Sequence, residues 1–340
     1  MKRMIAVLLT MVMCVALMTG CGGGSSSTDA GESGFNKITL TMAVNGTDTQ
    51  IDTLVANQFK ELVETATEGA VKVEVYPNDQ LAGGNATKGI EMIADGSTDI
   101  AAYATSVLSV LDEKMSIGTV PWLFDSYEQA RSVIDESGLA YYDQVLNQQG
   151  ITVLGSFHNG FRQLSNSKHA VTAPEDLKGL KIRVPGSEVY MQFFSALGAD
   201  PVAMNWGEVF TALQQGTIDG QENGLSITNT SGVLEVQDYV TVWNYTYEND
   251  LFLVNTALWD TLNEQTQQVI RESAVTACNW GRDQIEAEHD ALIEQFRADG
   301  VQVDVLTEEQ LAPFKEVVAD LSQSFFDKYG DEACAAFGVK

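Results

Sequence analysis

Apolar positions along the chain change their spacing in a regular order, from a helical period to a strand period and back. Between residues 51 and 66 the apolar side chains recur every three or four positions, which places one apolar stripe on a helix. Valines at positions 71, 73 and 75 then alternate with charged residues, as in a half-buried strand. Similar helix and strand patterns follow at residues 90–102, 127–154 and 182–197. This alternation predicts an α/β architecture with a mostly parallel sheet.

One helical period is much longer than the others. From Glu264 to Ala298 the apolar residues keep a helical spacing, and no proline occurs between Pro201 and Pro313. A helix of about 30 residues spans roughly 45 Å. Such a helix can cover both halves of a two-domain protein, and 340 residues are enough for two domains.

The N-terminal residues have the parts of a secretory signal. Two cationic residues precede an apolar run from Met4 to Met18, and small residues lead to Cys21. We therefore expect residues 1–20 to be a signal peptide of the lipoprotein type, with Cys21 lipidated, and residues 21–35 to be a flexible Gly/Ser tether. Thr19-Gly20-Cys21 is similar to a lipobox, although Met18 stands where such signals usually have Leu. Cleavage without lipidation is the alternative.

Composition narrows the classes of partner. The formal net charge is −28, with 47 acidic and 19 basic residues, which argues against nucleic acid and against binding anionic lipid through surface charge. The three histidines are scattered and no Cys/His spacing predicts a metal site. Cys278 falls on the apolar stripe of the long helix, and its pairing with Cys334 stays open, since sequence does not fix the distance between them.

A candidate anion site lies in the segment KIRVP at 181–185. Arg183 sits in an alternating apolar strand pattern, where a permanent cation needs a partner. A guanidinium presents a planar fork of donors that matches a carboxylate, so a ligand anion is one candidate. The amide of Asn223, forty positions further on, can add a donor and an acceptor. A structural ion pair for Arg183 and a turn position for Asn223 are the alternatives.

Six segments carry a resemblance to a known family. They are VEVYPNDQL at 73–81, PWLFDSY at 121–127, NGFR at 159–162, APEDLKGLKIRVP at 173–185, EVFTALQQG at 208–216 and DGQEN at 219–223. In this order they resemble the solute-binding proteins of tripartite ATP-independent periplasmic (TRAP) transporters, of the dicarboxylate-receptor type.

The resemblance implies a two-domain periplasmic-binding-protein-like fold. A ligand cleft would lie between two α/β domains that are joined by crossing strands and backed by a long helix spanning both. By family analogy, domain I comprises residues 36–158 plus 248–287, and domain II comprises residues 159–247 plus 288–340.

The resemblance also implies the ligand-binding residues. Arg183 matches the arginine that binds the ligand carboxylate through two bonds, Asn223 matches the amide of the same pocket, and Arg162 matches a second arginine near the hinge. Trp206 stands where many members have a Phe that packs against the ligand skeleton, a plain core tryptophan being the alternative. Asn45, after the first strand, aligns with an early polar contact.

Departures from the family pattern bear on the ligand. Segment AGGNA at 82–86 has lost two acids that members commonly carry, and Ala104 and Gly186 replace polar side chains of members that bind nine-carbon sugar acids. These differences disfavour sialic acid. They favour a smaller or more apolar acid, such as a monocarboxylate or a short dicarboxylate.

The function implied is that of a receptor without cofactor or catalysis. It would capture a small organic carboxylate outside the cell, namely a monocarboxylate, a sugar acid or a short dicarboxylate. Attached to the membrane by its lipid anchor or free in the periplasm, it would deliver the acid to membrane subunits of a TRAP transporter. The sequence shows no Gly-x-Ser-x-Gly motif and no phosphate-binding loop, which argues against common enzyme classes. A ligand sensor for a membrane signalling receptor is the alternative.

Overall fold

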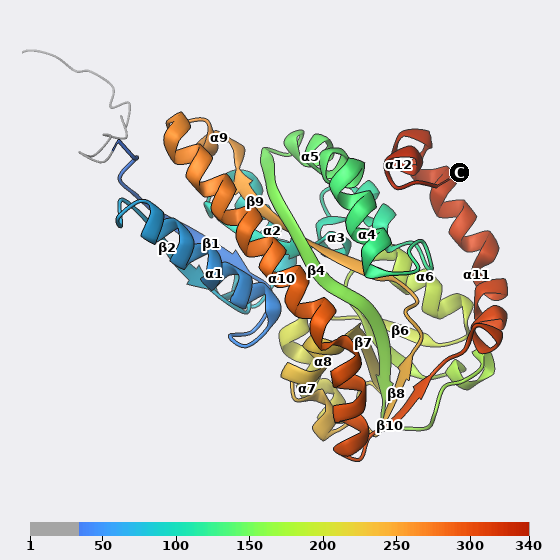
Figure 1. Cartoon of the computed structure of the whole chain (residues 1–340). Helices are drawn as coiled ribbons and strands as arrows, with labels where there is room; N and C mark the ends of the chain where they lie inside the picture. The colour runs from blue at the N-terminus through green and yellow to red at the C-terminus, as the bar shows by residue number, and fades with distance from the viewer. Residues whose placement is uncertain (1–33, 340) are drawn as a thin grey trace, which may run out of the picture.

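The computed structural model describes residues 34–339, and it has the predicted α/β architecture (Figure 1). The predicted signal peptide and Cys21 lie outside the described residues. Gly34, which we placed in the tether, already accepts a hydrogen bond of 3.0 Å from the side chain of Asn263. The described chain is therefore held to the body of the protein from its first residues.

One sheet organises the molecule. Its main path runs in the order β2 (Val71–Tyr76), β1 (Ile38–Val44), β3 (Ile100–Ala104), β9 (Tyr247–Asn255), β4 (Ile151–Asn166), β7 (Gly220–Gly224), β5 (Lys181–Val184) and β6 (Asp200–Ala203). Strand β8 (Tyr239–Val242) pairs with β4 and with β10 (Gln302–Val305). We call the elements around β1, β2 and β3 lobe 1, and those around β5, β6 and β7 lobe 2.

The prediction of a mostly parallel sheet is wrong for the centre of the sheet. Strands β1, β2 and β3 pair in parallel, as do β5, β6 and β7, except where β7 meets β4. The long strands β4 and β9 pair antiparallel with each other and with the first strand of each lobe that they meet. The sheet is therefore mixed, because two strands cross from one lobe to the other.

Helix α10 (Glu264–Ala298) has the bounds that the apolar period predicts. Its 35 residues begin at Glu264, and the side chain of the preceding N-cap residue, Asn263, accepts a hydrogen bond from the N–H of Thr266. Its first half packs with α1 (Ile51–Ala66) against lobe 1, and its second half packs against β8 and β10 (Figure 1). Gly281 permits this approach, since a Cβ there would lie 2.5 Å from Cγ2 of Val55. The helix thus braces both lobes.

The remaining helices complete the two lobes. Helices α2 (Ala86–Asp95), α4 (Tyr127–Val133), α5 (Leu139–Asn147), α6 (Glu188–Ala196) and α11 (Glu308–Tyr329) share the largest apolar core. The shorter helices are α3 (Thr105–Leu108), α7 (Trp206–Gln214), α8 (Leu225–Thr230), α9 (Thr256–Trp259) and α12 (Asp331–Ala336). No helix of residues 34–339 is long and apolar enough to cross a membrane.

The two cysteines of the described chain are free thiols. Cys278 is buried on α10, on the apolar stripe that the sequence predicts, and Cys334 is partly buried on α12. The pairing left open by the sequence is not present in the structure. Burial raises the pKa of the Cys278 thiol to about 12, which makes it a small apolar core residue rather than a reactive one.

Candidate functional site

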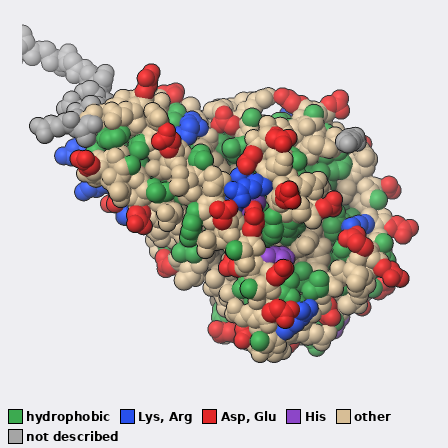
Figure 2. Space-filling model, in the orientation of Figure 1, with side chains coloured by type: hydrophobic (Ala, Val, Ile, Leu, Met, Phe, Trp, Pro, Cys, Tyr) green, Lys and Arg blue, Asp and Glu red, His purple; other side chains and the backbone are tan. Residues whose placement is uncertain are grey.

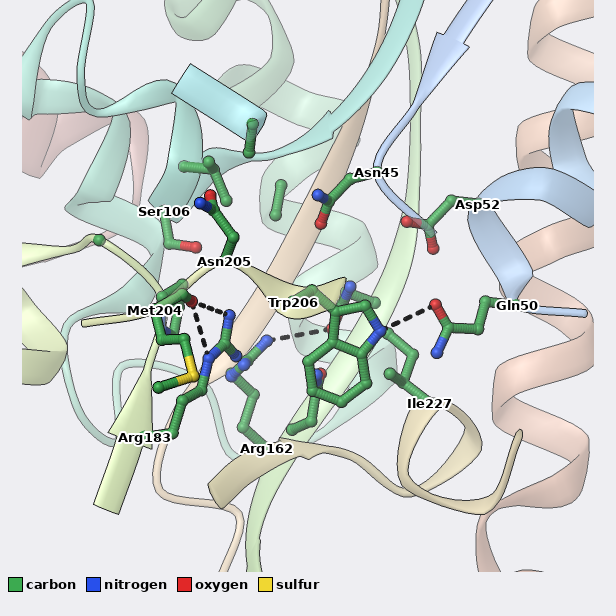
Figure 3. Close-up of a pocket in the computed structure, with 17 residues that line it drawn as sticks. Asn45, Gln50, Asp52, Ser106, Arg162, Arg183, Met204, Asn205, Trp206 and Ile227 are labelled. Atoms are coloured by element: carbon green, nitrogen blue, oxygen red, sulfur yellow. Dashed lines mark hydrogen bonds between the residues drawn. The ribbon is translucent and has the colours of Figure 1, made fainter. Parts of the chain in front are cut away.

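A cavity between the lobes brings together all five residues that the resemblance implied (Figure 3). Asn45 follows β1, Arg162 lies on β4, Arg183 on β5, Trp206 at the start of α7 and Asn223 on β7. The residues meet because they lie at or directly after the carboxyl ends of β1, β5 and β7, at the start of α7, or on the crossing strand β4. The same cavity is also lined by Ala104 and Gly186, the two positions that the sequence comparison with receptors of nine-carbon sugar acids singled out.

Arg183 is a buried cation without an ion-pair partner. Its side chain is 4 % exposed, and no carboxylate of the described residues lies within ion-pair distance of it. Its Nε and Nη2 groups donate to the carbonyl oxygen of Met204 at 3.0 and 2.7 Å. Burial lowers its pKa to about 9, with Glu222 offsetting part of the effect. The structural ion pair that the sequence left open for Arg183 is therefore absent from the described chain.

Arg162 differs from Arg183, because its charge is already balanced. Its Nε and Nη2 groups donate to the two carboxylate oxygens of Glu222 at 2.5 and 2.9 Å, and Glu248 lies 3.8 Å from its Nη1. Burial alone would lower the pKa of Arg162, but Glu222 and Glu248 raise it well above its usual value. Of these two arginines, Arg183 is the one that has no ion pair among the described residues.

Asn223 occupies a strand, so its alternative as a turn residue is wrong. It lies in β7 opposite Gln163 of β4. Its Oδ1 accepts a hydrogen bond of 2.9 Å from the N–H of Gly224. This bond fixes the amide orientation and leaves Nδ2 as the donor that Asn223 offers to the cavity, where it lies with Arg183.

Trp206 closes the cavity from lobe 2. The guanidinium of Arg183 lies over its indole ring, 5.2 Å from the centroid. Its Nε1 donates a hydrogen bond of 3.1 Å to Oε1 of Gln50 in lobe 1. The ring is only partly buried and lines the cavity, so the alternative of a plain core tryptophan does not describe it.

Asn45 is positioned by a buried acid. Its Nδ2 donates to Oδ2 of Asp79 at 2.6 Å, and the hydroxyl of Tyr103 donates to the other oxygen of the same carboxylate at 2.8 Å. Asp79 adopts a left-handed backbone conformation with φ 52°, directly before the turn at Gln80–Ala82. Asn45 is thus a fixed part of the lobe 1 wall.

Sequence reasoning missed three polar residues of that wall. Gln50 and Asp52 lie at the start of α1, and Ser106 lies on α3 (Figure 3). Each is buried. Polar residues in the first turn of a helix are ordinarily explained by capping, so no local signal separated these from a routine helix start.

The empty space in the cavity, including the part open to solvent, is about 530 Å³. This volume can hold a small organic acid.

The described residues show neither a cluster of metal-ligating side chains nor, on the face seen in Figure 2, a basic patch. No group of three or more His, Cys, Asp or Glu side chains in the described residues is placed to hold a metal ion. On the face seen in Figure 2 acidic side chains are spread over both lobes and basic ones are few. The cationic character of the cavity is therefore local.

Comparison with known proteins identifies the family. Residues 42–329 match the family described as bacterial extracellular solute-binding protein, family 7. The chain belongs to this family. The similar structure from Ralstonia eutropha H16 described below is a TRAP periplasmic solute-binding protein. The family predicted from the six segments is therefore confirmed, and with it the two-domain fold.

Three similar proteins show the range of the family. The C4-dicarboxylate-binding periplasmic protein DctP of Rhodobacter capsulatus is 30% identical over 83% of this chain and 84% of its own length. A TRAP solute-binding protein from Ralstonia eutropha H16, solved with (S)-2-acetolactate, has a TM-score of 0.84 and 27% identity over 88% of this chain and 98% of its own. The sugar acid binding protein DctPAm from Advenella mimigardefordensis, solved with galactonate, has a TM-score of 0.84 and 28% identity over 89% and 97%.

Proposed function

We propose that this chain is the non-catalytic solute receptor of a TRAP transporter and that it captures a compact organic acid by its carboxylate. The observation that carries the proposal is the buried guanidinium of Arg183, which has no countercharge within ion-pair distance in the described chain and lines the cavity between the lobes. A buried unpaired charge is unfavourable, and an anion that enters the cavity relieves it.

The free donors around Arg183 match a carboxylate. Two of its five N–H groups are used by the carbonyl of Met204, which leaves Nη1 and one hydrogen of Nη2. One N–H of Nη1 and the remaining N–H of Nη2 point in the same direction, which suits a two-bonded contact with a carboxylate. Nδ2 of Asn223 supplies a further donor. Trp206 then packs against the carbon skeleton, and Arg162 and Asn45 complete the wall.

The membrane context is also part of the proposal. We place the boundaries of domain I at 36–158 plus 248–287 and those of domain II at 159–247 plus 288–340, with the cavity between them. The acid is delivered to the membrane subunits of the transporter. The chain is held at the outer face of the cell membrane by lipidation of Cys21.

A thermal-shift screen of purified protein against organic acids, followed by calorimetry of the hits, tests the proposal. We expect carboxylates to raise the melting temperature and their methyl esters to lose about a thousandfold in affinity, because the ester removes a charge-assisted contact and leaves Arg183 unpaired. Stabilisation by neutral sugars or amines and by no carboxylate contradicts the proposal. Turnover of a bound acid contradicts the absence of catalysis.

A further inference from the structure

Three buried polar atoms on the lobe 1 side of the cavity have no hydrogen-bond partner among the described residues. They are Oδ1 of Asp52, Nε2 of Gln50 and Oγ of Ser106. The three side chains are 5 %, 1 % and 0 % exposed, and all three line the cavity that holds Arg183. Buried polar groups are normally paired in folded proteins, so this wall is built to meet polar atoms of a ligand.

The orientation of Gln50 is fixed by two donors. Its Oε1 accepts from Nε1 of Trp206 at 3.1 Å and from the N–H of Thr47 at 2.9 Å. Both bonds require an oxygen at that position, so the amide is not free to flip. The unpaired atom of Gln50 is therefore a donor, Nε2.

The carboxylate of Asp52 is held against the loop before α1. A Cβ at Gly46 would lie 2.9 Å from Cγ of Asp52, so the two residues are in close contact. Asp52 stands in the first turn of α1, where the helix dipole favours an anion. Its unpaired Oδ1 is an acceptor on the same side of the cavity as Gln50 (Figure 3).

An acceptor beside a donor selects among ligand groups. A second carboxylate accepts from Gln50 but meets the negative charge of Asp52. An ammonium group donates to Asp52 but meets the N–H of Gln50. A hydroxyl donates to Asp52 and accepts from Gln50 at once, and a neighbouring hydroxyl can pair with Ser106.

We propose that Asp52 and Gln50 form a second recognition point, which binds a hydroxyl of the ligand and makes the receptor selective for hydroxy acids over dicarboxylates. This inference rests on the proposed function, since it assumes that the acid is held by Arg183. It narrows the ligand class from organic acids in general to acids whose hydroxyl lies away from the carboxylate.

Calorimetry with three four-carbon acids tests the inference. Butanoate, succinate and erythronate share one carboxylate and differ in carrying a methyl, a second carboxylate or hydroxyls. We expect the wild-type protein to bind erythronate at least tenfold more tightly than butanoate and to bind succinate more weakly than erythronate. Binding of succinate as tightly as erythronate overturns the inference.

Variants then assign the selectivity to named atoms. Asp52→Asn replaces the carboxylate by an amide that can donate, so the preference for erythronate over succinate should fall at least tenfold. Ser106→Ala should lower the ratio of erythronate to butanoate affinity. Asp48→Asn is the matched control, because it removes the same charge from an exposed side chain in the loop before α1, and it should change no ratio.

The outcomes separate the two proposals. If acids bind and Arg183→Lys weakens all of them, but the ratios are the same in the wild type and Asp52→Asn, the second recognition point is wrong and the receptor function stands. If neither these acids nor the wider screen yields a carboxylate that binds, the receptor function and the selectivity both fail.

Discussion

The indole Nε1 of Trp206 donates a hydrogen bond of 3.1 Å to Oε1 of Gln50, and the two residues lie on opposite lobes, 156 positions apart in the chain. The same indole carries the guanidinium of Arg183 on its face. One side chain therefore links the contact between the lobes to the cation of the cavity. Occupancy of the cavity and closure of the lobes are expected to be coupled through it.

Trp206→Phe isolates the hydrogen bond of this link, since the aromatic ring is kept. A net loss of about 1 kcal/mol is expected, which lowers ligand affinity several-fold, mainly through faster release. Trp206→Ala also removes the ring and should lose about 1–3 kcal/mol and reorder preferences among acids. Stopped-flow fluorescence measures the rates of ligand association and ligand release for each variant.

A matched control for this variant is Trp122→Phe. Trp122 also donates its indole N–H to another residue, the carbonyl oxygen of Trp243 at 3.4 Å, but it lies outside the cavity. Its replacement should leave ligand affinity unchanged. Equal effects of the two substitutions would show that the loss at Trp206 is general destabilisation.

Ligand binding should compact the protein. Asn45 lines the cavity from lobe 1, and Arg183 and Asn223 line it from lobe 2. A ligand that contacts both sides should therefore draw the lobes together. Small-angle scattering with saturating acid should give a smaller radius of gyration than scattering without it. Indistinguishable curves would count against closure.

Substitutions of Arg162 should mainly affect stability, whereas substitutions of Arg183 should mainly affect ligand binding. Arg162→Met leaves the buried carboxylate of Glu222 unpaired and should lower the free energy of unfolding by about 3–5 kcal/mol. Arg183→Met removes a cation that has no ion-pair partner in the described chain, so stability should hold or rise while binding is lost. Arg183→Lys keeps the charge but not the planar fork and should also lose most affinity.

Denaturant unfolding and calorimetry on the same preparations check this pair. The informative quantity is the difference between the Arg162 and Arg183 variants in stability and in ligand affinity. A large stability loss in Arg183→Met, or near-native affinity in Arg183→Lys, would refute the role given to Arg183.

Asp52 should make stability and binding depend on pH in opposite senses. Burial raises its pKa to about 6, with Asp79 adding to the shift and backbone N–H groups of Gly46 and Asp52 opposing it. Asp250, whose own pKa burial raises, also interacts with Asp52. Because the folded pKa exceeds the unfolded value of 3.8, the contribution of Asp52 to stability is present below pH 3.8 and is lost as pH rises through 6.

A ligand hydroxyl that donates to Asp52 stabilises the carboxylate and lowers its pKa, so affinity for a hydroxy acid should rise as pH increases through 6. The difference between wild type and Asp52→Asn isolates this group from the other acids. Calorimetry in buffers of different ionisation enthalpy should detect proton release on binding at pH 6. Proton uptake would contradict the assignment.

Gly281→Val tests the packing of α10. The added Cβ would meet Val55 of α1 at 2.5 Å, and overpacking of this kind costs about 1–3 kcal/mol. Ala287→Val, at an exposed position of the same helix, should change stability by less than about 0.7 kcal/mol. Equal melting temperatures for the two variants would show that the helix can move away from α1.

The sequence by itself determined those helices and strands whose buried residues recur at a regular spacing along the chain. The 35-residue helix α10 has the bounds that its apolar stripe predicts, and α1, β2 and β5 appear where the spacing places them. The order of the six segments also determined the family, and the resemblance to that family indicated the five residues that meet in the cavity. These features are local or are carried by side chains with a distinctive chemistry.

Only the tertiary structure decided the balance of charges and the course of the crossing strands. Arg162 and Arg183 look alike in sequence, but Glu222 forms an ion pair only with Arg162 of these two. The register of β4 and β7 places Arg162 opposite Gly224, two positions from Glu222, so that the two side chains meet diagonally. The antiparallel course of β4 is set by the strands that it pairs with in both lobes. The spacing of apolar residues within β4 does not show the direction of those partners. The unpaired atoms of Gln50, Asp52 and Ser106 are likewise defined by what does not lie near them in space, which spacing along a chain does not encode.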